Sequence, residues 1–127
     1  MMLDRLFHHS ADLGLLVEWA DLGDVRRGEY RDATRTIVLH RDLTRAQATA
    51  TLAHELGHAA FGDRCSTPEA ERRAWEYGAA LTITAADYRR AERVAGPHPS
   101  AIAAELGVTR RLVEAWRDWY RRTRLTD

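Results

Sequence analysis

Between residues 15 and 40 the hydrophobic positions have a spacing typical of extended structure. A short stretch at residues 3–13 could form a helix. After it, Leu15, Val17 and Trp19 alternate with Leu16, Glu18 and Ala20, which suggests a strand. Two further segments of this kind are residues 28–32 and residues 34–40, the second of which is rich in β-branched side chains. Polar turns separate the three segments. We therefore predict three short strands that pair in a small antiparallel sheet.

From residue 44 onward the hydrophobic pattern becomes helical, and each expected helix begins at a residue that can cap it. Thr44 and Gln47 form a capping box in front of a helix that should end near Gly62. Thr67 caps a second helix, with Pro68 at the first helical position, where its missing backbone N–H costs nothing. The pattern thus predicts two consecutive helices joined by a short turn.

Three more helices complete the chain. Thr84 and Asp87 open one that ends at Gly96, and two further helices follow at residues 100–106 and 110–123. A run of strands followed by a run of helices is typical of an α+β domain. We expect a single α+β domain over the whole chain, with about five helices beside the small antiparallel sheet.

The composition limits the partners that this domain can have. A chain of 127 residues fits one compact domain. Because 19 basic residues balance 19 acidic ones, neither a nucleic acid nor an anionic membrane would attract the surface as a whole. The single Cys65 cannot form an intrachain disulfide, and no apolar leader or membrane-spanning run is visible. We expect a cytoplasmic protein with no membrane partner.

The candidate chemistry lies in the first long helix. His54 and His58 are four residues apart, so their rings project from one helix face and can bind one metal ion. Glu55 lies about 100° around the helix, where it can reach a water on that metal. In this H-E-x-x-H arrangement zinc acidifies a water and the Glu takes its proton. Such a motif also arises by chance, in which case both imidazoles would be hydrogen-bonded core side chains without a metal.

The surroundings of the motif favour the metal. Between Arg45 and Asp63 the only charged residue is Glu55, although nearly a third of the chain is charged. The helix is therefore expected to be buried over most of its circumference. A buried carboxyl group and two buried imidazoles need polar partners, because isolated polar groups cost several kcal/mol in an apolar interior. A metal ion with its water would satisfy all three groups.

A catalytic zinc needs a third protein ligand, which we look for in the second helix. This helix offers Glu69, Glu71 and Glu76. Glu71 shares a face with apolar residues, and the tight turn between the helices brings it close to His58. Glu69 and Glu76 share a face with arginines and read as solvated surface charge. Asp63, in the turn itself, is the weaker alternative. We expect Glu71 to be the ligand.

The last two helices, over residues 99–123, have the spacing of a helix-turn-helix. Their six arginines could contact phosphates, but four acidic residues leave residues 97–127 with a net charge of only +2. We therefore expect this pair to complete the core or to dock a protein, with no sequence-specific DNA binding by the protein alone. A non-enzymatic DNA-binding or antirepressor protein that acts through these helices is the alternative to an enzyme.

Several of these residues together resemble a known family. The stretch TLAHELGHAAFGD follows a strand that contains Ile37, and a helix with Glu and aromatic positions at fixed spacing comes next. The positions on that helix are Glu71, Ala74, Tyr77 and Ala79. This combination resembles the ImmA/IrrE family of metallopeptidases, in particular the short versions from phages, prophages and mobile elements.

The resemblance implies a zincin-like fold and a zinc-dependent endopeptidase activity. It implies one Zn2+ per chain, bound by His54, His58 and Glu71, with Glu55 as the catalytic base. It further implies a protein substrate, a helix-turn-helix transcriptional repressor that controls phage or mobile-element immunity and is cleaved at a peptide bond. The scissile bond itself does not follow from the resemblance.

Two further elements are candidates for handling that substrate. The strand at residues 36–39 could accept an extended peptide along its edge by β-augmentation. No residue stands out as the group that stabilises the oxyanion, and Tyr77 and Tyr88 are the candidates that we consider.

Overall fold

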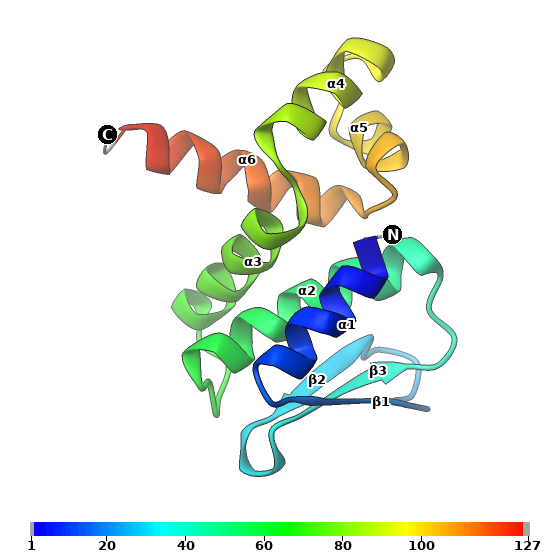
Figure 1. Cartoon of the computed structure of the whole chain (residues 1–127), viewed down its shortest axis with the longest axis vertical. Coiled ribbons are helices and arrows are strands. Elements are labelled where there is room, and N and C mark those ends of the chain that lie inside the picture. Colours follow the sequence, from blue (N-terminus) through cyan, green and yellow to red (C-terminus); the bar gives the residue numbers. More distant parts are fainter. Residues whose placement is uncertain (1, 126–127) are drawn as a thin grey trace.

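A computed structural model describes residues 2–125 as an α+β fold, as the sequence predicts (Figure 1). The first half contains α1 (Met2–Asp12), β1 (Leu16–Ala20), β2 (Gly28–Arg31), a short 3-10 helix (Asp32–Thr34) and β3 (Thr36–His40). The second half contains α2 (Arg45–Phe61), α3 (Pro68–Thr82), α4 (Ala85–Ala95), α5 (Pro99–Leu106) and α6 (Arg110–Leu125). The described part thus has six helices, one more than the five expected, because the stretch at residues 3–13 does form a helix.

The sheet is mixed, so the prediction of an antiparallel sheet is wrong for one of its two strand pairs. The strand order is β1-β3-β2, with β1 parallel to β3 and β2 antiparallel to it. Alternation of hydrophobic side chains specifies which residues face the core but not the direction of the neighbouring strand. The order also corrects the expectation of a free edge at residues 36–39. This segment is the central strand, and the strand edge beside α2 belongs to β2.

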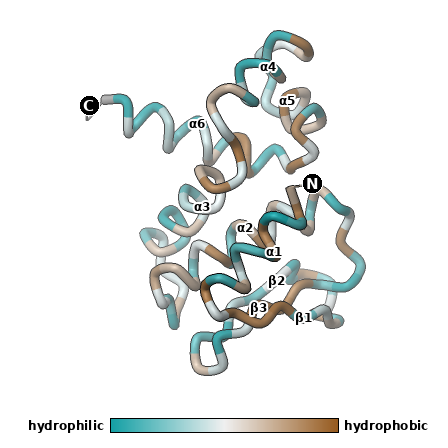
Figure 2. Tube along the Cα trace, in the orientation of Figure 1, coloured by the Kyte–Doolittle hydropathy of each residue, from teal (hydrophilic) through white to brown (hydrophobic). Residues whose placement is uncertain are grey.

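The core lies where α1 and α2 cover one face of the sheet (Figure 1). The strongly hydrophobic β3, brown in Figure 2, contributes Ile37 and Leu39, both without exposed surface. They pack in one cluster with Leu52 and Leu56 of α2, which are equally buried. Burial of these side chains on the sheet side fixes which face of α2 points away from it, towards α3.

The boundaries of α2 and α3 are the predicted ones. The Thr44 hydroxyl accepts a hydrogen bond from the backbone N–H of Gln47 at 3.1 Å. In turn, the side-chain oxygen of Gln47 accepts one from the backbone N–H of Thr44 at 3.0 Å. Gly62 ends α2 in the left-handed conformation, with φ of 63°. The Thr67 hydroxyl caps α3 and Pro68 begins it. Local side-chain chemistry therefore sets both ends of the hairpin that carries the motif.

The two helices of this hairpin touch through their backbones. A Cβ atom on Gly57 would lie 2.3 Å from the carbonyl oxygen of Ala74, and one on Gly78 would lie 2.5 Å from that of Ala53. Neither position has room for a side chain. Because these contacts lie on both sides of the crossing, they fix the separation of α2 and α3 and thereby place the start of α3 beside the motif.

The C-terminal helices α5 and α6 form a helix pair whose buried side chains join the core. Gly107 turns the chain between α5 and α6 with φ of 72°. Leu112 and Val113 of α6 are fully buried, and α6 also packs along α3. Its Trp116 is 3% exposed, and the indole N–H donates to the backbone oxygen of Ile83 at 2.9 Å. Across residues 2–125, no helix has the length and apolar character needed to cross a lipid bilayer.

Candidate metal centre

Two histidines of α2 and one glutamate of α3 converge on one point. The Nε2 atom of His54 lies 2.9 Å from Oε2 of Glu71, and Nε2 of His58 lies 3.0 Å from Oε1 of the same carboxylate. One nitrogen from each ring and one carboxylate oxygen all lie within 4.8 Å of one another. The structure thus brings together the three ligands that the sequence suggests.

This donor set fits a zinc ion. Two imidazole nitrogens and one carboxylate oxygen are the protein ligands of one well-known class of catalytic zinc site, in which a further position stays open. Glu71 is the most accessible of the three, with a side chain 36% exposed against 14% for His54 and 10% for His58. The group therefore faces a cleft instead of being closed within the core, as a catalytic site requires.

The surroundings of Glu71 favour the charged form of its carboxylate. The Ser66 hydroxyl donates to Oε1 at 2.9 Å. Partial burial of Glu71 works to raise its pKa, but this hydrogen bond and the nearby His54 and His58 outweigh it and lower the pKa. A charged carboxylate is the form that binds a metal.

Asp63 orients His58 from the far side of its ring. Its Oδ2 atom lies 2.9 Å from Nδ1 of His58, and its Oδ1 accepts from Arg73 at 3.4 Å. Because the left-handed Gly62 reverses the chain, the N–H of Asp63 bonds back to the His58 carbonyl at 2.9 Å. A carboxylate that accepts the Nδ1 proton leaves the Nε2 lone pair for a metal. Asp63 thus lies behind His58 and outside the group of three. Its place just after the helix-ending glycine is the sequence signal that points to it.

Trp75 forms a wall beside His54. The two rings are stacked, with centroids 4.2 Å apart and planes 14° from parallel. The guanidinium of Arg111, from α6, lies over the same indole at 4.4 Å from its centroid. Burial works to lower the pKa of His54, but Glu55 and Glu71 outweigh this and raise it. Helical periodicity places Trp75 on an apolar face, but the stacking across three helices depends on the tertiary fold.

Glu55 lies next to the three donors without being one of them. Its side chain is buried, and Oε2 lies 3.3 Å from Nδ1 of His54. It lines the same cleft as the donors, a hollow of about 360 Å3 bounded by β2, α2, the loop after α2 and the start of α3. On β2 a Cβ atom at Gly28 would lie 2.6 Å from Cγ2 of Thr51 and 3.5 Å from Cγ of Glu55. A glycine there lets the edge strand approach the acid closely.

Other sequence-based candidates lie away from this cleft. The hydroxyl of Tyr77 is 3.1 Å from Nε2 of His9, and that of Tyr88 accepts from Arg117. Neither tyrosine lines the cleft, so both are wrong as oxyanion-stabilising candidates. Glu69 is exposed, as expected.

Glu76 is buried, which corrects its interpretation as surface charge. The side chain is 7% exposed and forms ion pairs with Arg72 of the same helix and Arg122 of α6. The crossing of α6 over α3 covers this position. Because α6 is distant in the sequence, the helical period of α3 alone gives no sign of that cover.

The comparison with known families places the chain in a peptidase family. The family Peptidase_M78, described as the IrrE N-terminal-like domain, matches residues 11–115, which include His54, Glu55, His58 and Glu71. No curated protein and no solved structure matches the chain.

Proposed function

Because the chain belongs to the ImmA/IrrE family of metallopeptidases, with a zincin-like fold, we propose that it is a zinc-dependent endopeptidase that cleaves a protein partner. The observation that carries the proposal is the convergence of His54, His58 and Glu71 within 4.8 Å in an open cleft. A buried carboxylate, Glu55, lies beside them on the same helix. These are the parts that peptide hydrolysis by an activated water needs.

The roles of the residues follow from their positions. His54, His58 and Glu71 would hold one zinc ion, which supplies a Lewis acid and a water of lowered pKa when bound. Glu55 accepts the proton of the attacking water and then delivers it to the amine that leaves. Asp63 keeps the His58 ring in one tautomer and one orientation. Trp75 stacks on the His54 ring and holds the plane of that ring.

The free edge of β2 is a suitable place for the substrate backbone. Among the described residues, 2–125, this strand pairs only with β3, and its residues Gly28, Glu29 and Tyr30 line the cleft. An extended peptide that adds to β2 by β-augmentation would run past Glu55 and the three donors. Because Gly28 has no side chain, β2 can lie directly against Thr51 and Glu55 of α2, which brings this edge close to the acid.

We further propose that the partner is a helix-turn-helix transcriptional repressor that controls phage or mobile-element immunity. The resemblance of the HELGH stretch and the Glu71 helix to short phage and prophage peptidases supports this choice. The rival, an antirepressor that binds DNA through α5 and α6, gains little from the structure. The start of α6 is held against α3 by the contact between Arg111 and Trp75, which is unfavourable for a helix that must enter a DNA groove.

Cleavage of a candidate helix-turn-helix repressor tests the proposal. The two are co-expressed, and the repressor is followed on a gel with the wild type and with Glu55→Gln. An amide cannot accept the proton of water, and general-base assistance is worth about 10²–10⁴-fold, so the variant should leave the repressor intact. It should still bind zinc and retain the repressor as a stable complex. Equal cleavage by wild type and variant, or relief of repression without any cleavage by either, would refute the proposal.

A further inference from the structure

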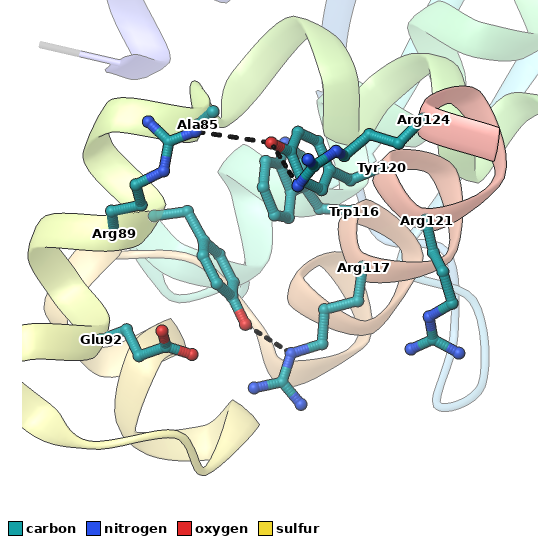
Figure 3. Close-up of a pocket in the computed structure, with 9 residues that line it drawn as sticks. Ala85, Arg89, Glu92, Trp116, Arg117, Tyr120, Arg121 and Arg124 are labelled. Atoms are coloured by element: carbon teal, nitrogen blue, oxygen red, sulfur yellow. Dashed lines mark hydrogen bonds between the residues drawn. The ribbon is translucent and has the colours of Figure 1, made fainter. Parts of the chain in front are cut away.

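A second hollow, of about 550 Å3, lies between α4 and α6 (Figure 3). It shares no lining residue with the metal cleft. Four arginines line it, Arg89 from α4 and Arg117, Arg121 and Arg124 from α6. Within residues 2–125, Glu92 is the one acidic residue on its wall, so the lining residues have a formal charge of +3. We refer to it as the arginine groove.

Stacked aromatic rings support this groove. Trp116 lies between Tyr88, with ring centroids 4.4 Å apart, and Tyr120, with centroids 4.7 Å apart. Both pairs are within 17° of parallel. Trp116 is 3% exposed and is hydrogen-bonded to the backbone of Ile83. The floor of the groove is therefore rigid, and it belongs to the core of the protein.

Three of the four arginines contact this floor, and Arg117 also donates to the backbone oxygen of Pro97. Arg89 donates to the hydroxyl of Tyr120 at 3.4 Å, and Arg117 donates to that of Tyr88. The guanidinium of Arg124 lies 5.3 Å from the Tyr120 ring centroid. Among residues 2–125, no ion pair with a carboxylate is formed by these three or by Arg121, whereas Arg90 on the same helix as Arg89 pairs with Asp87. Their positive charge is left for a ligand.

We propose that the arginine groove binds an acidic segment of a protein partner. A planar guanidinium offers two parallel N–H donors that match a carboxylate. A hollow of this size holds several side chains. Complementary charge gives such an interface specificity and a fast association rate. The binding does not require peptide hydrolysis, because the groove and the metal cleft have no residue in common.

Nucleic acid fits the same observations less well. Bases of a single strand stack on free aromatic faces, but the rings here stack on one another, and Arg124 lies over Tyr120. A duplex needs a broad basic surface for its phosphates. The basic residues here gather in a concave groove, and Glu114 and Asp118 lie on the same helix as three of them. We therefore commit to a carboxylate-bearing peptide.

A titration of the isotope-labelled full chain followed by NMR tests the proposal. The probe is a twelve-residue peptide with Glu at alternate positions, and its control is the same peptide with Gln at those positions. Concentrations up to about 2 mM detect even millimolar affinities. We expect shifts confined to α4 and to α6 from Trp116 onward, including the indole N–H of Trp116. The Gln peptide should bind at least about tenfold more weakly, because it lacks the carboxylates.

Two charge reversals locate the site. Arg121→Glu should weaken binding of the acidic peptide about tenfold, whereas Arg93→Glu, an equal charge change on the exposed surface of α4 outside the groove, should change it less than about twofold. A thermal melt confirms that each variant is folded, and Arg124→Gln replaces Arg121→Glu if that variant is not. Equal binding of the two peptides, equal effects of the two reversals, or no shift at all would overturn the proposal. Tighter binding of a twelve-nucleotide strand, a DNA duplex or pyrophosphate in the same groove would also overturn it.

Discussion

The indole of Trp75 lies flat on the imidazole of His54, with ring centroids 4.2 Å apart and an angle of 14° between the planes. This contact joins the α3 wall of the cleft to a ring that we propose binds zinc. Because Arg111 of α6 covers the same indole, the C-terminal helix pair also supports the metal centre. The orientation of one ligand therefore depends on a residue more than fifty positions away in the sequence.

Replacement of Trp75 by Ala should loosen the metal site. Without the indole the His54 ring can rotate, and changes behind a metal ligand typically lower affinity 10–100-fold. We expect a loss of about tenfold in zinc affinity, measured by competition with a coloured chelator. Trp19→Ala is the matched control, since that indole lies on β1 and contacts Phe7. If both variants bind zinc as the wild type does, the stack has no role in orienting His54.

Asp63→Asn should weaken zinc binding through His58. The amide carries no charge to stabilise the Nδ1 proton and can present its own N–H to the ring, which favours the wrong tautomer. The expected loss of zinc affinity is about 10–100-fold, by the same chelator competition. Asp12→Asn, an exposed residue at the end of α1, should have no effect. A wild-type affinity for Asp63→Asn would show that His58 needs no orienting partner.

Three Glu-to-Gln changes on α3 should give three different results. Glu71→Gln should lose zinc, because the amide is a poor metal ligand. Glu69→Gln should leave both zinc content and stability unchanged, because its side chain is exposed. Glu76→Gln should keep zinc but lower the free energy of unfolding by about 1–3 kcal/mol, since it removes the buried charge that pairs with Arg72 and Arg122. Elemental analysis and urea denaturation measure the two quantities, and zinc loss in Glu69→Gln alone would invalidate the assignment of Glu71.

Gly57→Ala should damage fold and site together. Its methyl group would meet the backbone of Ala74 at 2.3 Å, so α2 and α3 must move apart. Overpacking of this kind costs about 1–3 kcal/mol, and the movement also withdraws Glu71 from the histidines. We expect lower stability in urea and weaker zinc binding. Because the contact is with backbone atoms, adding Ala74→Gly should not restore either property, and full rescue by that change would contradict the packing described.

The features that the sequence predicts well are those set by neighbouring residues. Thr44 with Gln47 and Gly62 specify the ends of α2 through bonds within one turn of the chain. The four-residue interval between His54 and His58 places two rings on one face whatever the rest of the fold does. Glu71 follows from helix-face reasoning combined with a short turn. The family resemblance points to the same residues, and the family match confirms the family.

The features that the sequence does not predict depend on contacts between distant elements. The direction of β1 relative to β3 has no signature in side-chain alternation. Burial of Glu76 requires the crossing of α6, and the wall at His54 requires Arg111. These are properties of tertiary packing, which helix periods and cap residues do not encode.

The uncovered edge of β2 has a consequence for self-association. A free strand edge can pair with the same edge of another copy and start aggregation. Here the edge is only four residues long, and its Glu29 is flanked by ion pairs with Arg26 at 3.2 Å and Arg31 at 2.8 Å. Two such edges brought together would bury these charges against each other, whereas a single flexible peptide can leave them hydrated. The strand can therefore pair with a peptide from another protein, whereas the buried charges make pairing between two copies of this protein unfavourable.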